Sequence, residues 1–258
     1  MGWERLTVAA EGKTIDALGQ FELIPVFGHV GRAVGFTQSS LHMLFAVGLI
    51  IALVIVGMGR RAIVPGRLQS MTEGLYVFVE GLCLDQIGEQ GKRFFPFVFA
   101  LFMFILFGNL IGLLPFAFTF TSHIVVTFAL AMIVFVLITV VALVLHGKKF
   151  FGYFFPEGAP IWLAPIIIPV EIVSYMSRPI SLSIRLFANM VAGHVMLKVF
   201  ATFVVLLGGL GVIGPFVAVL PLAVNVALVG FEVLVALLQA YVFAILTTIY
   251  LHDAVHLH

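Results

Sequence analysis

The sequence predicts an all-α integral membrane protein with about five transmembrane helices and one amphipathic interfacial helix. Hydrophobic residues make up 62% of the 258-residue chain, and its mean hydropathy is +1.23. Charged residues make up only 10%, against roughly 25% in soluble domains, so lipid must solvate most of the surface. Several stretches also approach the roughly 20 apolar residues that a bilayer crossing requires. We therefore expect residues 1–258 to form a single membrane domain.

The composition excludes several classes of function. The formal net charge is +1, which leaves no basic footprint for nucleic acid. The single cysteine, Cys83, excludes an internal disulfide and a multi-cysteine metal site. The sequence also contains no Gly-x-x-x-x-Gly-Lys motif that could hold phosphates. We expect no nucleotide site, no metal and no cofactor in this chain.

The N-terminal half predicts an interfacial segment followed by three transmembrane helices. Residues 1–37 lack the basic-then-apolar order of a signal peptide and are expected to lie on the membrane surface. The expected spans are residues 38–60, 94–115 and 123–146. Lysine or arginine clusters follow the first and third spans, whereas the turn after the second span has neither. By the positive-inside rule, these clusters are cytoplasmic and the N-terminus is outside.

Residues 66–92 show a different pattern. Apolar residues recur there at steps of three and four, while acidic residues occupy other positions around a helix. The apolar set is Leu68, Met71, Leu75, Phe78 and Leu82. This pattern predicts an amphipathic helix that lies along the cytoplasmic interface or against a partner subunit.

The last two helices are predicted at residues 161–207 and 215–252, on either side of a glycine-rich turn. Glycine clusters followed by proline mark turns, and residues 208–215 hold both. Each arm contains roughly 40 residues and would be about 60 Å long, twice the thickness of a bilayer. The two helices are therefore expected to be antiparallel and either strongly tilted or broken.

Folding these two helices back on each other groups their polar residues into three tiers. The grouping assumes the same rise per residue in both arms, counted from the glycine-rich turn. The expected tiers are Arg185 level with Gln239, Glu171 level with Asp253, and His194 close to the level of Glu232.

Arg185 lies within the first long helix, where a guanidinium at bilayer depth costs at least about 2.5 kcal/mol. Glu171 and Asn189 fall within about 40° of Arg185 around the helix, whereas His194 points to the opposite face. Titratable groups thus flank the arginine on both sides, without a continuous polar stripe through it. Because arginine cannot lose its proton and relay it, the pattern predicts two aqueous routes that end at a central barrier. The missing partner is expected to be a carboxylate on another chain.

Three segments resemble the signature of subunit a of the F-type ATP synthase. They are residues 178–194, RPISLSIRLFANMVAGH, residues 108–115, GNLIGLLP, and Glu232 together with residues 238–243, LQAYVF. The resemblance extends from about Phe36 to the C-terminus. It implies that Arg185 faces the carboxylates of a rotating ring of c subunits, with Asn189 and Gln239 as polar neighbours.

The same resemblance implies roles for the other ionisable residues. His194 and Glu232 match the pair that lines the periplasmic proton route, in the order found in mitochondria and many alphaproteobacteria. Glu171 and Asp253 match acidic positions on the cytoplasmic route. Gly112 stands where some members carry an acid, so no proton-relay role is assigned to it.

The function implied is that of a proton-translocating stator subunit, which is not catalytic alone. Two offset half-channels would deliver protons to and from the c-ring carboxylates, with Arg185 as the barrier, and would couple the proton gradient to rotation and ATP synthesis. The expected partners are protons, the lipid membrane, the c-subunit ring, b-type peripheral stalk subunits and the rest of the synthase, but no nucleic acid. The expected location is the bacterial inner membrane, with the mitochondrial inner membrane as the alternative.

Other interpretations of these residues stay open at this point. Arg185 could form a structural ion pair with Glu171 or Glu232. His194 and Glu232 could be a satisfied buried pair, and Asn109 could simply be an interhelical hydrogen-bonding group. The chain could also be an ion-coupled symporter or a structural scaffold. The first half has only Asn109 as a polar interruption, which argues against the repeat that symporters usually show, and three ionisable tiers argue against a scaffold.

Overall fold

A computed structural model describes residues 9–10, 13–14, 25, 36–59, 65–114, 117–147, 150, 152, 163–211 and 213–256, and this part of the chain is almost entirely helical. The helices are α2 (Gln38–Gly59), α3 (Arg67–Ile87), α4 (Gly91–Gly112), α5 (Ile124–His146), α6 (Ala164–Gly208) and α7 (Gly214–Val255), with a short 3-10 helix, η2 (Phe120–Ser122). Strands β1 (Ala9–Ala10) and β2 (Lys13–Thr14) pair antiparallel. Most of the expected surface segment 1–37 and the basic residues at 60–61 and 148–149 lie outside the described residues.

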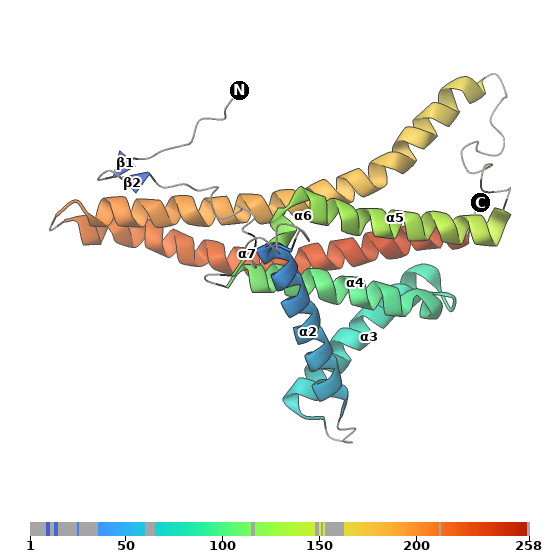
Figure 1. Cartoon of the computed structure of the whole chain (residues 1–258), viewed down its shortest axis with the longest axis horizontal. Coiled ribbons are helices and arrows are strands. Elements are labelled where there is room, and N and C mark those ends of the chain that lie inside the picture. Colours follow the sequence, from blue (N-terminus) through green and yellow to red (C-terminus); the bar gives the residue numbers. More distant parts are fainter. Residues whose placement is uncertain are drawn as a thin grey trace.

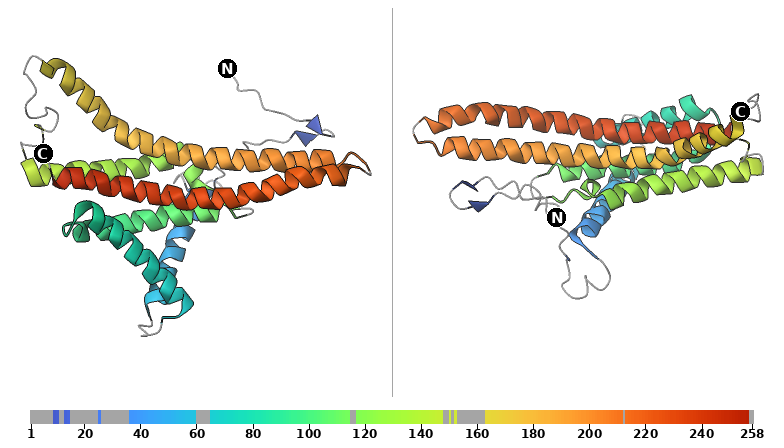
Figure 2. Two further views of the ribbon diagram at one scale, coloured as in Figure 1. Left: turned by 180° about the vertical axis from the view of Figure 1, so that it is seen from behind. Right: turned by 90° about the horizontal axis from the view of Figure 1, so that it is seen from above.

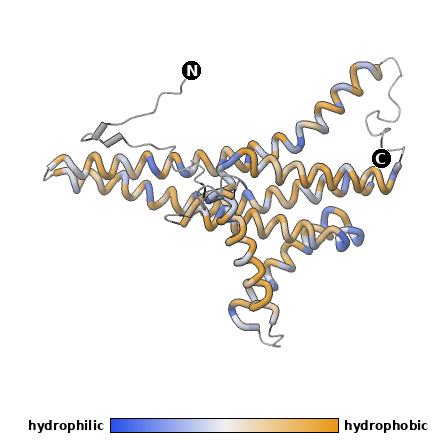
Figure 3. Tube along the Cα trace, in the orientation of Figure 1, coloured by the Kyte–Doolittle hydropathy of each residue, from blue (hydrophilic) through white to orange (hydrophobic). Residues whose placement is uncertain are grey.

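Within these ranges, five helices are long and apolar enough to cross a membrane, namely α2, α4, α5, α6 and α7. Together with α3, they confirm the expected class of all-α membrane protein. Figure 3 shows these helices hydrophobic over most of their lengths, with hydrophilic residues gathered where α3 meets α4. The outward faces are apolar too, since Val125 and Val144 of α5 are both 77% exposed. Such a surface requires lipid around it.

Helices α6 and α7 form one long antiparallel hairpin, as expected (Figure 1). They contain 45 and 42 residues and meet at the glycine-rich turn, where Gly211 adopts a φ of 72° that only glycine reaches without strain. At 1.5 Å per residue each helix is about 65 Å long, twice the roughly 30 Å of a hydrocarbon core. In Figure 1, α2 runs across the direction of the hairpin. Neither hairpin helix can therefore stand upright in the membrane.

The first part of α6 turns away from α7, as both Figure 1 and Figure 2 show. Pro169 and Pro179 lie inside this helix. Each proline removes a backbone hydrogen bond and crowds the preceding turn, which bends a helix. The hairpin is therefore closely paired near its turn and open at its other end.

The core lies where α3, α4 and α5 pack against the hairpin, and α2 runs outward beside α3 and α4 (Figure 2). The fully buried side chains Met103, Ile105, Leu186, Phe243 and Leu251 come from α4, α6 and α7. These contacts hold the middle of the hairpin in a fixed position.

Helix α3 buries a different stripe from the apolar one noted in the sequence. Its buried residues are Thr72, Val79, Cys83 and Ile87, whereas Leu68, Met71 and Phe78 are 43%, 49% and 44% exposed. The most buried stripe of α3 therefore contains a polar threonine as well as apolar residues. Leu75 and Leu82 of the predicted apolar set are half-buried against the core. The exposed apolar residues of α3 are left for lipid or a partner subunit.

Candidate functional site

Arg185 is exposed on the face of α6 and lines a groove between α6 and α7 with a volume of about 450 Å³. Asn189, Glu232 and Gln239 supply the other polar groups of this groove, and its remaining lining is apolar. In the described part of the chain, the Arg185 guanidinium has no ion pair and no hydrogen bond. The structural ion pair with Glu171 or Glu232 is therefore not formed, and the charge faces outward.

Asn189 and Gln239 join the two long helices one helical turn from Arg185. The Asn189 Nδ2 atom donates to Gln239 Oε1 across 2.9 Å. Gln239 is only 3% exposed, and its Nε2 group has no hydrogen-bond partner among the described residues. An unsatisfied donor at the groove is available to a group that enters it.

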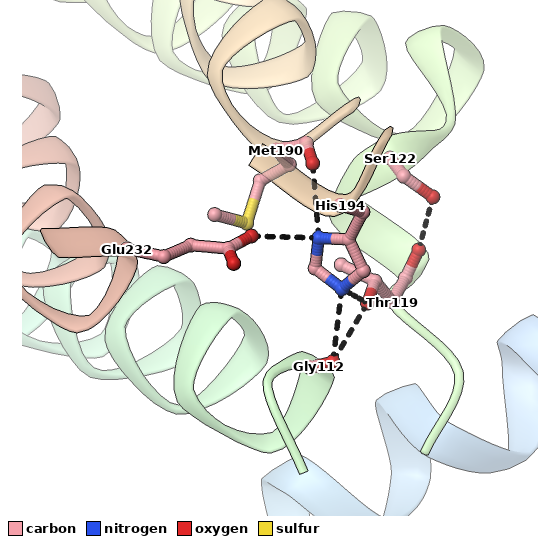
Figure 4. Close-up of polar contacts among 6 residues, drawn as sticks. All are labelled: Gly112, Thr119, Ser122, Met190, His194 and Glu232. Atoms are coloured by element: carbon pink, nitrogen blue, oxygen red, sulfur yellow. Dashed lines mark hydrogen bonds and ion pairs between the residues drawn. The ribbon is translucent and has the colours of Figure 1, made fainter. Parts of the chain in front are cut away.

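His194 and Glu232 form a second polar tier nearer the turn (Figure 4). His194 Nδ1 lies 2.9 Å from Glu232 Oε1 and 3.0 Å from the Met190 carbonyl, so the carboxylate makes an ion-pair contact beside a hydrogen bond to the backbone. On the other side of the ring, Nε2 lies 2.8 Å from Thr119 Oγ1 and 3.1 Å from the Gly112 carbonyl. His194 therefore points away from the Arg185 face, toward the α4–α5 connection.

The Glu232 carboxylate is buried but poorly satisfied. It is 4% exposed, and apart from the contact of Oε1 with His194 neither oxygen has a hydrogen-bond partner in the described ranges. Burying a carboxylate with so few partners costs free energy, and its remaining surroundings are those of the groove that it lines. The pair thus lies between two places. His194 contacts Thr119 and Gly112 near the α4–α5 connection, and Glu232 lines the groove that contains Arg185.

Asp253 does not lie level with Glu171, as was expected, but pairs with Arg178. Asp253 Oδ2 instead lies 3.4 Å from Arg178 Nη1, and Arg178 also lies over the rings of Tyr175 and Tyr250. Arg178 is seven residues after Glu171, about 10 Å further along the helix. The prediction of equal registers was wrong at this end because α6 bends away from α7.

Glu171 is half-buried near the start of α6, between Pro169 and Pro179, and no described residue bonds to its carboxylate. Its assignment to a proton route stays a prediction. Asn109 is fully buried, and its Nδ2 lies 3.5 Å from the Ala236 carbonyl of α7. This long contact between α4 and α7 fits the simpler interpretation of Asn109 as an interhelical hydrogen-bonding group.

Sequence reasoning predicted no contact for three residues of these clusters. Thr119 and Gly112 contact His194 from more than 70 positions away, and no local pattern announces such a contact. Arg178 did offer a signal, because it lies seven residues before Arg185 and therefore near the same helix face. A second intramembrane arginine in one motif needs its own partner.

The described residues contain no group of three or more histidine, cysteine, aspartate or glutamate side chains placed to hold a metal ion. Outside the spanning helices, burial lowers the pKa of His123, which lies between η2 and α5. His123 is therefore neutral at pH 7, and its ring stacks on Phe118. It contributes packing rather than charge to this end of the chain.

The helices and the ionisable hairpin define a multi-pass membrane protein of the α-helical class. The family model of the ATP synthase A chain matches residues 40–252. The chain is 63% identical to ATP synthase subunit a of Granulibacter bethesdensis, over 97% of this chain and 100% of that protein. It is 57% identical to the subunit a of Gluconobacter oxydans, over 95% of this chain and 99% of that protein, and 56% identical to that of Acidiphilium cryptum, over 96% and 100%. The chain belongs to the ATP synthase A chain family.

Proposed function

We propose that this chain is the proton-translocating stator subunit in the membrane sector of an F-type ATP synthase. The observation that carries the proposal is the exposed Arg185 guanidinium, which has no partner in the described residues. A permanent charge at this depth costs at least about 2.5 kcal/mol unless it is compensated. Because the chain belongs to a synthase family, we assign a carboxylate of the c-subunit ring as the group that compensates it.

The two proton routes follow from the groups on either side of Arg185. Toward the turn, the His194–Glu232 pair opens into the groove of Arg185 and forms the periplasmic route. Toward the open end, Asp253 and Glu171 form the cytoplasmic route. Asn189 and Gln239 support the arginine between the two routes.

The mechanism depends on where a ring carboxylate is neutral. A carboxylate that receives a proton from the His194–Glu232 side becomes neutral and can then face lipid at low cost. When rotation returns it to Arg185 from the other side, the fixed positive charge favours its ionised form, and the proton leaves toward Asp253 and Glu171. Arg185 cannot release its own proton, so protons do not pass directly between the two routes.

Coupling to ATP formation then requires several protons. A membrane potential of 100 mV supplies about 2.3 kcal/mol for each charge that crosses. One proton is therefore too little, and the ring pools several before the catalytic head makes one ATP. This chain is not catalytic alone. Its partners are the c-subunit ring, b-type peripheral stalk subunits and the catalytic head, and its location is the bacterial inner membrane.

The proposal is tested with Arg185→Ala and Arg185→Lys in the assembled complex. Proton uptake is measured in vesicles that carry the membrane sector alone, and ATP synthesis is measured with the whole complex. Arg185→Ala should abolish synthesis while passive proton flux persists or rises. Arg185→Lys keeps the charge but loses the planar fork and can shed its proton, so coupling should also fall.

Arg93→Ala is the matched control, because Arg93 is an exposed arginine at the start of α4, away from the hairpin groove. This variant should synthesise ATP at the wild-type rate. Wild-type synthesis in either Arg185 variant would remove Arg185 from the mechanism.

A further inference from the structure

Three contacts join His194 Nε2, the Thr119 hydroxyl and the Gly112 carbonyl to one another (Figure 4). Nε2 lies 2.8 Å from Thr119 Oγ1 and 3.1 Å from the Gly112 carbonyl, and the Thr119 hydroxyl donates to the same carbonyl across 3.0 Å. Thr119 is 5% exposed. A buried hydroxyl and a backbone carbonyl thus meet one nitrogen of the imidazole ring.

The bonding partners determine which ring nitrogen carries a hydrogen. A carbonyl oxygen only accepts hydrogen bonds, and its two lone pairs can accept from both Nε2–H and the threonine hydroxyl. Because the hydroxyl gives its hydrogen to Gly112, its oxygen is left to accept from Nε2–H. The contacts with Thr119 and Gly112 therefore both favour a hydrogen on Nε2.

The opposite nitrogen has a different environment. Nδ1 faces the Met190 carbonyl at 3.0 Å and Glu232 Oε1 at 2.9 Å. Of these two groups, the carboxylate is the one that can take up or release a proton. In a histidine, the hydrogen bond made by one ring nitrogen commonly determines whether the other nitrogen carries a hydrogen.

We propose that Thr119 is a positioning residue which, together with the Gly112 carbonyl, keeps His194 protonated on Nε2, so that the proton exchanged with Glu232 is the one on Nδ1. This inference rests on the proposed function of the His194–Glu232 pair. In one state, both ring nitrogens carry hydrogen and Glu232 is a carboxylate. In the other state, the Nδ1 proton has moved to Glu232, and Nε2–H stays bonded to Thr119 and Gly112.

Gly112 contributes by having no side chain. A Cβ atom on residue 112 would lie 2.6 Å from Thr119 Oγ1 and 2.7 Å from its Cγ2, which would push the threonine away from His194. Ser122 supports the same turn, because its Oγ donates to the Thr119 carbonyl. The absence of an acid at position 112 thus leaves room for the hydroxyl that holds the histidine.

The test compares Thr119→Val, which keeps the shape and removes the hydroxyl, with Thr119→Ser, which keeps the hydroxyl. Thr127→Val is the matched control, since Thr127 is a fully buried threonine bonded to Ser183 rather than to His194. Passive proton flux is measured in vesicles that carry the membrane sector and is normalised to the assembled complex. Thr119→Val should slow the flux roughly tenfold, whereas Thr119→Ser and Thr127→Val should stay near wild type.

A purely structural role of Thr119 would not change the protonation of the ring. Nitrogen-15 solid-state NMR of histidine-labelled complex reports this protonation directly, and the His194 signals are those lost in His194→Gln. Nε2 should be protonated in the wild type, and Thr119→Val should populate the form that carries hydrogen on Nδ1 alone. An unprotonated Nε2 in the wild type would overturn the inference even if Thr119→Val fails to assemble.

His194→Gln and Glu232→Gln separate this inference from the proposed function. If both variants slow the flux while Thr119→Val does not, only the role of Thr119 is refuted. Equal loss in Thr119→Ser and Thr119→Val would also refute it, because packing rather than the hydroxyl would then matter. Wild-type flux in both glutamine variants would refute the proposed periplasmic route itself.

Discussion

Replacing Arg178 with glutamine and Asp253 with asparagine should destabilise the chain by amounts that do not add. Arg178 Nη1 lies 3.4 Å from Asp253 Oδ2, and the guanidinium lies 5.3 Å and 4.9 Å from the ring centroids of Tyr175 and Tyr250. This cluster ties the end of α7 to α6. Removing either charged partner removes the same ion pair, so the second substitution should add little further loss of stability.

The magnitude follows from exposure. The side chains of Arg178 and Asp253 are 20% and 37% exposed, so solvent screens the pair and we assign it about 1 kcal/mol, the upper end for exposed pairs. Each ring contact adds roughly 0.5 to 1 kcal/mol. Arg178→Gln should therefore cost about 2 to 3 kcal/mol and Asp253→Asn about 1 kcal/mol. The double variant should cost about as much as Arg178→Gln alone.

The assay is the free energy of unfolding of the chain in mixed micelles, followed by loss of helical circular dichroism as sodium dodecyl sulfate is added. Glu171→Gln is the matched control, because no described residue bonds to the Glu171 carboxylate. It should cost less than about 0.5 kcal/mol and add to Asp253→Asn. If the losses of unfolding free energy for Arg178→Gln and Asp253→Asn add, the observed Arg178–Asp253 pairing is refuted. Coupling between Glu171→Gln and Asp253→Asn would instead support the register expected from equal helical rise.

Two further predictions concern a thiol and a glycine. Burial raises the pKa of Cys83 to about 11, so the native thiol should react with maleimide at pH 8 far more slowly than in the chain denatured by detergent. The thiol loses its proton at its ordinary pKa of 9.0 in the unfolded chain but only near 11 in the native chain. The free energy of unfolding should therefore fall as the pH rises from 9 to 11. A free energy of unfolding that does not change over this range would show that the pKa of Cys83 is unperturbed. Gly193→Ala should lower proton flux about as strongly as Glu232→Gln, because its Cβ would lie 2.5 Å from Glu232 Oε1, whereas Gly81→Ala, with open space around it, should not.

The spans, the hairpin and the contacts nearest the turn are predictable from the sequence because their signals are local. Apolar length marks each span, and the glycines at 208–214 mark the turn. Close to that turn, two helices of equal rise stay in register, so the tier of His194 with Glu232 is expected and observed. Gln239 bonds to Asn189, one turn from the residue that was expected level with it.

The open end was not predictable by the same counting. A bend at Pro169 or Pro179 is expected from the missing backbone donor, but its direction depends on what packs around the helix. The register therefore drifts with distance from the turn, and Asp253 meets Arg178 instead of Glu171. A counting argument is reliable only over the stretch in which both helices are straight.

The environment of His194 shows why sequence reasoning assigned no role to position 112. The resemblance drew attention to an acid that is missing there, and a missing acid predicts no contact. In three dimensions, the residue contributes its carbonyl to Nε2 and its empty Cβ position to Thr119. An aspartate at 112 would occupy the place of the Thr119 hydroxyl and would bring a second charge beside the histidine. Gly112, Thr119 and His194 therefore depend on one another, and adding a side chain at position 112 or removing the Thr119 hydroxyl should disturb the histidine.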